Sequence, residues 1–482
     1  MPRNGFQLDL NLCTGCAACV VACAIENELP WGTSWRWVDT FNAERLPGIP
    51  VHHLSLACNH CADAPCARAC PAAAYSRDPA TGAVLLDGEK CIGCRYCTWA
   101  CPYDAPRFDA AEGVVSKCTF CNHRQREGKS PACVGQCPTG ALRFGPVDEL
   151  EGRPQVPGFP RAPADPAIRF LPLRPGTWVP SVDLPAERGE AGEELHPWRY
   201  EAQPIPQPAP EAKLSFAREW PLWFFTLTVS VLVGLMASPG GRATLGWPVF
   251  AAAAGLAVTA STLHLGRPER AWRAMLGWRT SWLSREILLF GAFAASGTAL
   301  LAGAFGDLRV AGVPVWETGV ALLGFATLFA MDRVYGVVHS REVGFHSART
   351  LTTGLLVATL VAAPAPVWMT VVGYKLLLYG ARKHRLAARG RPWGPRVSGI
   401  RVASSLSGAA LLAGGIPASA ILLGPGGGLS LVGTAPVTAV AGLVLLALGE
   451  ALDRGEFYQE LTVPTPARQV QEDLASVVAA LT

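Results

Sequence analysis

The sequence predicts two unlike parts, a small α+β domain at the amino terminus and an all-α bundle of membrane-spanning helices after it. All 16 cysteines lie between Cys13 and Cys137. Hydrophobic residues make up 50% of the 482 residues and charged residues only 16%, whereas soluble domains average about 25% charged. Long apolar stretches recur from about residue 219 onward. A chain of this length is also expected to divide into at least two domains.

The charge balance and the first residues exclude two classes of protein. The 41 Lys and Arg residues nearly balance the 37 Asp and Glu residues, so no basic excess favours nucleic acid as a partner. The start, MPRNGFQLDL, has neither a charged and apolar leader nor a twin arginine. We therefore expect no nucleic-acid partner, and no disulfide framework of the kind that secreted proteins carry.

Composition divides the chain further. Residues 1–145 are cysteine-rich, with short apolar runs and Gly and Pro turns, and predict a compact, loop-rich α+β domain. Residues 146–215 contain 15 prolines, a density that excludes helix or central strand and predicts an extended connector with polyproline II character. The connector is either a tether or an arm that packs on a partner. Residues 216–460 are assigned to the membrane bundle, and residues 461–482 to a C-terminal tail.

Eight apolar stretches approach the length of about 20 residues that a helix needs to cross a bilayer. They lie near residues 221–238, 247–265, 286–305, 315–333, 350–364, 366–381, 402–423 and 431–449. The fifth and sixth are shorter than a typical span and could form one partly re-entrant hairpin. We therefore predict a bundle of eight transmembrane helices in a lipid bilayer.

The cysteines form four groups of four, and each group ends with the spacing C-x3-C. The groups are Cys13, Cys16, Cys19, Cys23; Cys58, Cys61, Cys66, Cys70; Cys91, Cys94, Cys97, Cys101; and Cys118, Cys121, Cys133, Cys137. The first and third read C-x2-C-x2-C-x3-C, and a proline follows the last cysteine in three of the four groups. This is the run with which bacterial ferredoxins bind [4Fe-4S] clusters.

Sixteen ligands suffice for four [4Fe-4S] clusters with no thiol left over. In such a run the first three cysteines hold one cluster, and the fourth binds its neighbour. We therefore predict a ferredoxin-like domain built from two bacterial-ferredoxin-type units. Four zinc sites, each with four cysteines, are the alternative, but zinc ribbons usually space two C-x2-C pairs further apart. A line of four redox centres implies electron transfer.

The stretches CTGCAACVVACAIEN, CNHCADAPCARACP, CIGCRYCTWACPYDAP and KCTFCNHRQREGKSPACVGQCPTGAL resemble the four-cluster electron-transfer subunit of dimethyl sulfoxide reductase and its molybdopterin-enzyme relatives. The resemblance covers residues 5–145 and implies a molybdopterin-containing catalytic subunit as partner. It also implies how the motifs pair, the first with the fourth and the second with the third. The implied ligand sets are Cys13, Cys16, Cys19, Cys137; Cys23, Cys118, Cys121, Cys133; Cys58, Cys61, Cys66, Cys101; and Cys70, Cys91, Cys94, Cys97.

The run STLHLGRPERAWRAMLGWRTSWLSREILLFGAF resembles the membrane anchor of the same reductases, an eight-helix bundle without haem. The chain then resembles a natural fusion of two subunits. His264 ends the second predicted span and Glu286 begins the third, so both should lie at one membrane face, where polar residues are functional candidates. The resemblance implies that they form a quinone site, at which His264 bonds the quinone oxygen and Glu286 relays a proton. Alternatively, His264 is a helix-end residue and Glu286 pairs with Arg285 or Arg267.

Other polar residues of the bundle have plainer interpretations. Arg267 and Arg270 are expected to lie at the membrane interface or to shape the loop after the second span, and one of them could contact the cysteine domain. Lys375 in the sixth span is expected to extend its amine to the membrane surface. The histidine pattern shows no pair within the spans that would hold haem b, so no haem is expected.

Basic residues predict the orientation. The loops after spans two, four and six carry 15 Lys and Arg residues, whereas the opposite loops carry only Arg242 and Arg309. By the positive-inside rule the cysteine domain faces the cytoplasm of a multi-pass protein of the bacterial inner membrane. The better-known reductases of the family face the other way, so this feature favours the cytoplasm-facing members, such as those that oxidise sulfite.

The leading hypothesis is an electron-transfer and anchor subunit that links the membrane quinone pool to a separate catalytic subunit, carrying at most the quinone half-reaction itself. A redox-driven ion-translocating module is the alternative, and few carboxylates within the predicted spans argue against it. A self-sufficient quinone reductase is a third possibility, but no flavin, nicotinamide or molybdopterin motif is visible.

Overall fold

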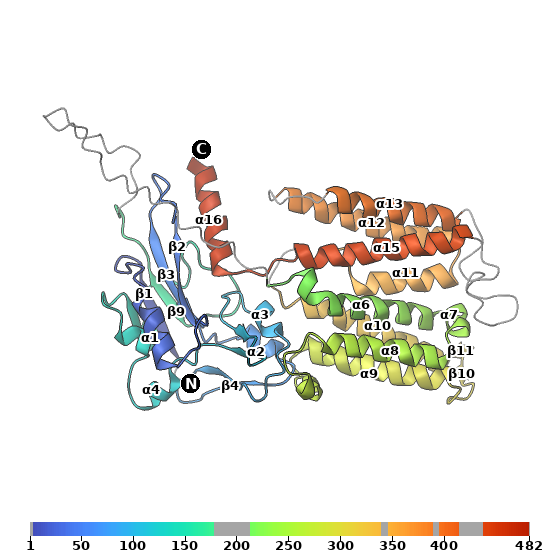
Figure 1. The fold of residues 1–482 in the computed structure, drawn as a ribbon, viewed down its shortest axis with the longest axis horizontal. Helices are drawn as coiled ribbons and strands as arrows, with labels where there is room; N and C mark the ends of the chain where they lie inside the picture. The colour runs from blue at the N-terminus through green and yellow to red at the C-terminus, as the bar shows by residue number, and fades with distance from the viewer. Residues whose placement is uncertain (1–2, 178–212, 339–345, 389–394, 414–436, 482) are drawn as a thin grey trace.

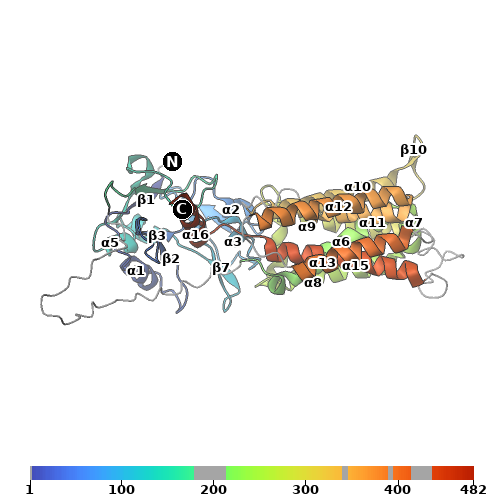
Figure 2. The ribbon, with the colours of Figure 1, turned by 90° about the horizontal axis from the view of Figure 1, so that it is seen from above.

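The computed structural model describes residues 3–177, 213–338, 346–388, 395–413 and 437–481. Residues 3–171 form an α+β domain, here called the cysteine domain, and residues 216–460 contribute a bundle of long helices, here called the helical bundle. The cysteine domain sits against one end of the helical bundle, and the chain ends lie on the cysteine-domain side (Figures 1 and 2).

The cysteine domain is built from short strands and helices. Its strands are β1 (Asn4–Asp9), β2 (Arg36–Phe41), β3 (His52–Ala57), β4 (Tyr75–Arg77), β5 (Val84–Leu86), β6 (Arg107–Asp109), β7 (Val114–Ser116), β8 (Leu142–Pro146) and β9 (Ile168–Leu171). Its helices are α1 (Ala18–Glu26), α2 (Pro65–Ala69), α3 (Tyr96–Ala100), α4 (Asn122–Arg126), α5 (Ala132–Gly135) and the 3-10 turn η1 (Val147–Glu149). The strands form one three-stranded sheet and three hairpins, β2-β3, β4-β5 and β6-β7.

Pairing of β1 with β8 brings the first and fourth cysteine motifs together. The two strands are antiparallel, with Leu8 opposite Leu142. The first motif follows β1 and the fourth precedes β8, so their cysteines meet at the same end of the sheet. Phe6 and Leu8 are buried beneath this sheet, and Phe6 packs edge-on against Phe120. Burial of a large apolar side chain contributes about 1.5–3 kcal/mol, so the register of β1 is strongly determined.

The cysteine domain continues past the boundary predicted at residue 145. Strand β9 lies inside the segment assigned to the extended connector, and it pairs in parallel with β1, Leu8 opposite Phe170. Phe170 and Ile168 are buried in the core of the domain. Residues 178–212, which carry the rest of the predicted connector, lie outside the described residues.

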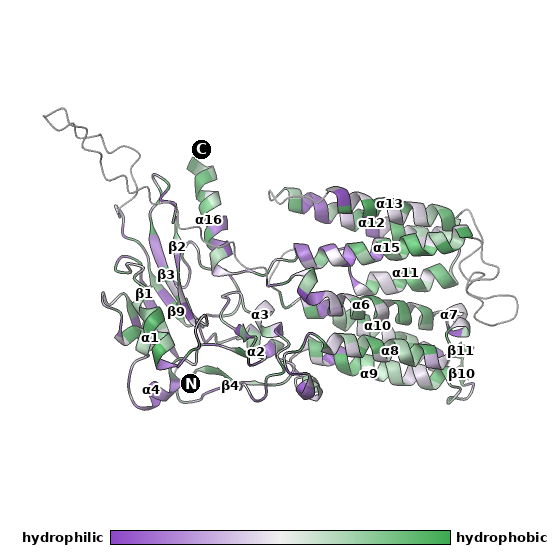
Figure 3. Cartoon of the chain, viewed as in Figure 1, coloured by the Kyte–Doolittle hydropathy of each residue, from purple (hydrophilic) through white to green (hydrophobic). Residues whose placement is uncertain are grey.

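Within the described residues, eight long helices overlap the eight apolar stretches of the sequence. They are α6 (Phe216–Ala237), α8 (Trp247–Thr262), α9 (Trp282–Leu301), α10 (Val315–Tyr335), α11 (Thr350–Ala362), α12 (Ala365–Ala387), α13 (Pro395–Ala413) and α15 (Val437–Glu460). Shorter elements, α7 (Pro239–Thr244), the 3-10 helix η2 (Pro268–Met275) and the hairpin β10 (Arg309–Val310) and β11 (Val313–Pro314), connect them. The long helices run side by side, and hydrophobic residues recur along them (Figure 3).

Not all of these helices satisfy the criteria for a membrane span. By length and composition, only α6 and α10 among the described helices are long and apolar enough, while α8 and α11 are apolar but shorter. Helices α12, α13 and α15 carry charged residues near their ends closest to the cysteine domain (Figure 3). The structure therefore gives a helical region able to enter a membrane, and the number of eight spans stays a prediction.

Small residues allow the helices of the bundle to approach closely. Helix α6 packs on α8, α10 and α11, and α13 packs on α15. A side chain at Gly408 of α13 would lie 2.8 Å from the carbonyl oxygen of Gly442 in α15. Helix interfaces in membranes favour such residues, because dispersion contacts replace the hydrophobic effect there.

The loop between α8 and α9, residues 263–281, holds the cysteine domain against the helical bundle. Backbone N–H groups of this loop donate to the cysteine domain, from Arg267 to Ile92 (3.1 Å) and from Gly277 to Pro71 (2.7 Å). A side chain at Gly266 would lie 2.0 Å from the Gly113 carbonyl oxygen, so the backbones are in direct contact. The contact lies next to Cys70 of the second motif and Cys91 of the third.

Both arginines that were expected at this boundary contact the cysteine domain. The Arg267 guanidinium donates to the Glu112 carbonyl (2.8 Å), and Arg270 donates to the Gly88 (2.9 Å) and Cys91 (3.2 Å) carbonyls. Both arginines therefore help to hold the cysteine domain against the α8–α9 loop.

The C-terminal residues form an ordered helix that returns to the cysteine domain. Helix α16 (Pro466–Leu481) packs on β2. Val470 is buried in the core of the domain, and the Asp473 carboxylate accepts the backbone N–H of Gly158 (2.7 Å). The segment predicted as a tail thus contributes to the cysteine domain.

Candidate functional site

Three of the four implied ligand sets surround separate cavities. Cys58, Cys61, Cys66 and Cys101 line a cavity with an empty volume of about 340 Å³. The set of Cys13, Cys16, Cys19 and Cys137 lines one of about 330 Å³. The set of Cys70, Cys91, Cys94 and Cys97 lines one of about 300 Å³. Each cavity therefore combines three cysteines of one motif group with one cysteine from a group elsewhere in the chain.

The fourth set lies together between these cavities in the domain core. Burial raises the pKa of the Cys23 thiol to about 12, with Arg36 acting to lower it and the neighbouring Cys133 and Cys121 thiols acting to raise it. Cys118 is buried and interacts electrostatically with Cys23. Thiols this close and this buried are poor anions unless a metal or a cation compensates their charge.

Left-handed backbone conformations shape the motif loops. In the first motif, Gly15 has φ 72° and Ala17 has φ 57°, and in the third, Gly93 has φ 69° and Arg95 has φ 57°. The same two loop positions are thus left-handed in both C-x2-C-x2-C runs. A non-glycine residue in this conformation costs about 1–2 kcal/mol, and such residues gather at functional sites.

These loops direct backbone N–H groups at the sulfurs. The N–H of Gly93 donates to the Cys91 sulfur (3.4 Å), and the N–H of Phe120 donates to the Cys118 sulfur (3.3 Å). The N–H of Ala74 donates likewise to Cys70 (3.4 Å). Hydrogen bonds of this kind stabilise thiolates and help to set the potential of an iron–sulfur cluster.

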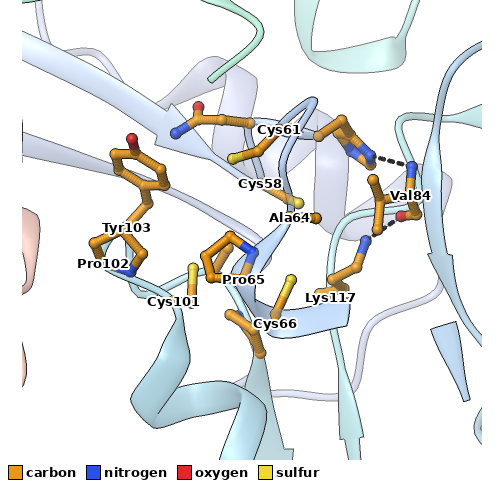
Figure 4. A pocket seen from close by; sticks show the side chains of 14 residues that line it. Cys58, Cys61, Ala64, Pro65, Cys66, Val84, Cys101, Pro102, Tyr103 and Lys117 are labelled. Atoms are coloured by element: carbon orange, nitrogen blue, oxygen red, sulfur yellow. Dashed lines mark hydrogen bonds between the residues drawn. The ribbon is translucent and has the colours of Figure 1, made fainter. Parts of the chain in front are cut away.

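The cavity of Cys58, Cys61, Cys66 and Cys101 shows the arrangement most clearly. The four sulfurs face the cavity from two separate segments of chain, and Lys117 lies beside them (Figure 4). The Lys117 amine donates to the carbonyls of Val84 and Cys118. Burial, together with the Lys117 charge, holds the pKa of His60 well below its ordinary value, so its ring is neutral there.

A further cavity lies at the junction of the two parts. It has an empty volume of about 400 Å³, and His264 and Glu286 both line it. Cys94 contributes to the same wall, and so do Tyr96 and Trp99 from helix α3. The structure therefore brings the two residues predicted for the quinone site together, next to a predicted cluster ligand.

Several polar groups of this cavity are unsatisfied. The Nδ1 atom of His264 and the Nε1 atom of Trp99 are buried without a hydrogen-bond partner among the described residues. Glu286 is 6% exposed. Tyr96 is engaged elsewhere, since its hydroxyl donates to the Val334 carbonyl (2.6 Å).

The alternative pairing of Glu286 does not form. Arg285 donates instead to the carbonyls of Trp278 (3.0 Å) and Arg279 (2.7 Å). Arg267 approaches Glu112 (3.7 Å). The Glu286 carboxyl thus remains available to a ligand in the cavity.

Sequence reasoning missed Tyr96 and Trp99 as residues of this cavity, because they lie within the third cysteine motif and resemble ordinary core aromatics. Only the docking of the helical bundle onto α3 places them there. The sequence offered one signal for their role, which is that both lie among the predicted cluster ligands Cys94, Cys97 and Cys101.

A buried network of charges occupies the other half of the helical bundle, and it corrects the expectation for Lys375. Lys375 is 1% exposed and its amine pairs with Glu450 (2.9 Å) instead of reaching the membrane surface. Asp453 accepts from Arg382 (3.0 Å) and Arg401 (2.9 Å). The acids of α15, among them the buried Asp453 and Glu456, lie beyond the span predicted at 431–449, so the expectation of few carboxylates within the spans is not contradicted.

Two family models match the chain, one in the cysteine domain and one in the helical bundle. A 4Fe-4S dicluster domain matches residues 49–147, and the DMSO reductase anchor subunit (DmsC) matches residues 247–370. The cavities, the cysteine loops and the helical bundle together define an iron–sulfur electron-transfer domain joined to a membrane anchor.

Curated relatives match the amino-terminal part. One chain of the anaerobic dimethyl sulfoxide reductase of Haemophilus influenzae is 37% identical over 190 residues, which is 37% of this chain and 92% of the relative. The corresponding chain of the Escherichia coli reductase is 40% identical over 156 residues, 31% of this chain and 76% of the relative. One subunit of the sulfite dehydrogenase of Allochromatium vinosum is 35% identical over 203 residues, 36% of this chain and 85% of the relative.

The chain belongs to the dimethyl sulfoxide reductase family of iron–sulfur subunits, and it carries the anchor domain of that family in the same polypeptide. It is an electron-transfer and membrane-anchor subunit of a reductase complex. The resemblance seen in the cysteine motifs and in the loop around His264 is thereby confirmed.

The Lys375–Glu450 pair gives a test of the buried network. Lys375→Met should lower the free energy of unfolding by about 3–5 kcal/mol, because removal of one partner leaves a buried charge uncompensated. Unfolding of the detergent-solubilised protein by heat or urea measures the loss. Tyr374→Phe is the matched control, since the neighbouring Tyr374 side chain is 47% exposed. Combining Lys375→Met with Glu450→Gln should restore much of the stability, and equal unfolding of wild type and Lys375→Met would refute the network's role.

Proposed function

We propose that the chain carries electrons between the membrane quinone pool and a separate molybdopterin-containing catalytic subunit, through four [4Fe-4S] clusters. The observation that supports this most directly is the cavity shared by Cys94, His264 and Glu286. A quinone bound there would lie beside the cluster held by Cys70, Cys91, Cys94 and Cys97.

The cysteine geometry suits cubane clusters better than single zinc ions. A zinc ion needs four sulfurs about 2.3 Å from one point. In the described part of the chain, which includes every cysteine, no three His, Cys, Asp or Glu side chains converge in that way. The sulfurs instead surround open cavities, and backbone N–H groups point at them. Each cluster, when bound, would accept and release one electron at a time.

The chain's own residues would handle the protons of the quinone reaction. A quinol that is oxidised releases two electrons and two protons. The His264 ring would bond one quinol oxygen and accept its proton, and the Glu286 carboxylate would accept the second proton and pass it toward water. Trp99 offers a further N–H donor to an anionic oxygen.

Ion translocation remains the alternative function, and the buried network is the observation that favours it. The network reaches from the end of the bundle near the cysteine domain to Lys375 and Glu450. Beyond them, residues 437–449 of α15 carry no charged side chain. A relay would therefore stop within the bundle, so electron transfer without pumping is the function that we propose.

The basic residues of the loops support an orientation in the membrane. The cysteine domain lies at one end of the helical bundle (Figure 1), residues of both parts line the cavity of His264 and Glu286, and the loops after predicted spans two, four and six carry most of the basic residues. We infer that this end faces the cytoplasm of a multi-pass inner-membrane protein, with eight spans.

The cluster proposal predicts the metal content. Anaerobically purified protein should contain about four [4Fe-4S] clusters, and therefore about 16 iron and 16 sulfide per chain. Colorimetric iron and sulfide analysis measures both, and metal analysis of the same sample reports zinc. A preparation that holds zinc and no iron would overturn the proposal.

The quinone proposal predicts a selective loss. His264→Ala and Glu286→Gln should each slow reduction of the clusters by a quinol analogue by about 100-fold or more, because acid–base help at the quinone oxygens is lost. A soluble dye, which can reach the clusters through the cysteine domain, should still reduce them at the wild-type rate. Thr259→Ala, on the exposed face of α8, is the matched control. If both cavity variants keep normal quinol-linked reduction with unchanged cluster content, the site is elsewhere.

The orientation predicts the location of two fusion points. A reporter that is active only in the cytoplasm should work when fused at residue 1, and one that is active only in the periplasm should work in the loop at 424–428, since an odd number of spans separates the two points. An active periplasmic reporter at residue 1 would reverse the topology.

A further inference from the structure

Arg36, at the start of β2, is a buried cation without a carboxylate partner. Its side chain is 1% exposed and ranks among the largest fully buried side chains of the protein. One guanidinium nitrogen donates to the hydroxyl (2.9 Å) and the carbonyl (3.3 Å) of Ser55, and Nε has no partner. Within the described residues no carboxylate pairs with it. A lone buried charge is costly, so the fold must supply a compensating negative charge.

The sulfurs of two different ligand sets surround this guanidinium. The Ser55 hydroxyl that receives its hydrogen bond lies 3.2 Å from the Cys19 sulfur. Arg36 also interacts electrostatically with the Cys133 thiol. Its remaining electrostatic partners are Cys118 and Cys23. Cys19 belongs to the implied set of Cys137, whereas Cys23, Cys118 and Cys133 belong to the next set, so Arg36 stands between two neighbouring clusters.

We propose that Arg36 is a redox-tuning residue, a shared counter-charge that raises the reduction potentials of the two clusters furthest from the quinone cavity. The inference rests on the proposed four-cluster wire. Each of these clusters gains one electron from its reduced neighbour and thereby one negative charge, and a buried cation favours that reduced state. Attraction between charges is strong here because protein of low dielectric constant separates them from water.

Other cations near the cluster cavities are compensated or partly exposed. Lys213, close to Cys101, pairs with Asp104 (2.8 Å). Arg270, close to Cys91, is partly exposed and approaches Glu269 (4.0 Å). Among the described residues, Lys117 alone resembles Arg36, since it is 3% exposed and acts on both Cys118 and Cys66. Arg36 therefore biases electrons toward the end of the wire away from the membrane.

Redox titration of the intact protein, followed by electron paramagnetic resonance, tests the proposal. Arg36→Met should make reduction of the two clusters of Cys19 and Cys133 at least tenfold less favourable, a fall of about 59 mV in each one-electron potential. The clusters of Cys58 and Cys70 should keep their potentials and serve as internal controls. Arg36→Lys, which retains the charge, should retain most of the wild-type values.

Two further variants keep the test decisive. Ser55→Ala should lower only the potential of the Cys19 cluster, because it removes the hydroxyl that joins Arg36 to that sulfur. If Arg36→Met fails to assemble clusters, the potential measured in Ser55→Ala tests the tuning role instead. Lys117→Met should shift a pair that overlaps this one by a single cluster, namely the cluster of Cys118 and Cys133 and the cluster of Cys58 and Cys66. Unchanged potentials in Arg36→Met or Ser55→Ala at full iron content, or an equal shift of all four clusters, would overturn the tuning role. An iron content below four clusters in the wild type would instead refute the four-cluster proposal.

Discussion

The contact between the α8–α9 loop and the backbone around Cys70 and Cys91 is the constraint on which the arrangement depends. An electron-transfer domain is useful to a membrane anchor only if a redox centre is held close to the lipid-soluble reactant. Here the connection is made by backbone hydrogen bonds and by a Gly266–Gly113 contact that leaves no room for a side chain. Because the backbones of Gly266 and Gly113 are in direct contact, side-chain rearrangements cannot change the distance between the two parts at this point. The cavity that His264 and Glu286 line depends on this docking, since α3 supplies one wall and the helical bundle the others.

Buried charge is the second organising feature, and the two parts use it differently. In the helical bundle, cations and carboxylates alternate, as in the Arg382–Asp453–Arg401 contact, so the network is internally compensated and serves chiefly to fix how α12, α13 and α15 pack. In the cysteine domain, Arg36 and Lys117 have no carboxylate partners within the described chain. Their natural counter-ions are thiolates. Without clusters the cysteine domain therefore lacks the negative charge that would balance these buried cations. This is expected of a domain whose folding is coupled to binding of its metal cofactor.

Much of this architecture could be predicted from the sequence. The cysteine spacing is a local signal, and so is the change of composition near residue 219, because both depend only on residues that are close along the chain. The pairing of the first motif with the fourth came from a family resemblance, and its physical basis is the β1–β8 ladder, a contact between residues about 140 apart. Strand β9 was missed because proline-rich sequence around it predicted extended chain, yet four residues without proline sufficed for pairing with β1. Lys375 was misread because burial of a lysine depends on a partner, Glu450, on another helix.

Fusion of the two parts in one chain changes the energetics of their docking. Two separate subunits that meet through this interface would lose translational and rotational freedom on association, at a cost of at least about 4 kcal/mol. In one chain the encounter is intramolecular, and the linker sets an effective concentration instead. This chain has a second covalent route as well, since α15 continues into α16, which packs on β2 and completes the core through Val470. The cysteine domain is thus tied to the helical bundle at both ends of the bundle's sequence. A loop closed in this way needs little further interface energy to stay docked, so residues at the interface can line the cavity of His264 and Glu286, as Tyr96 and Trp99 do.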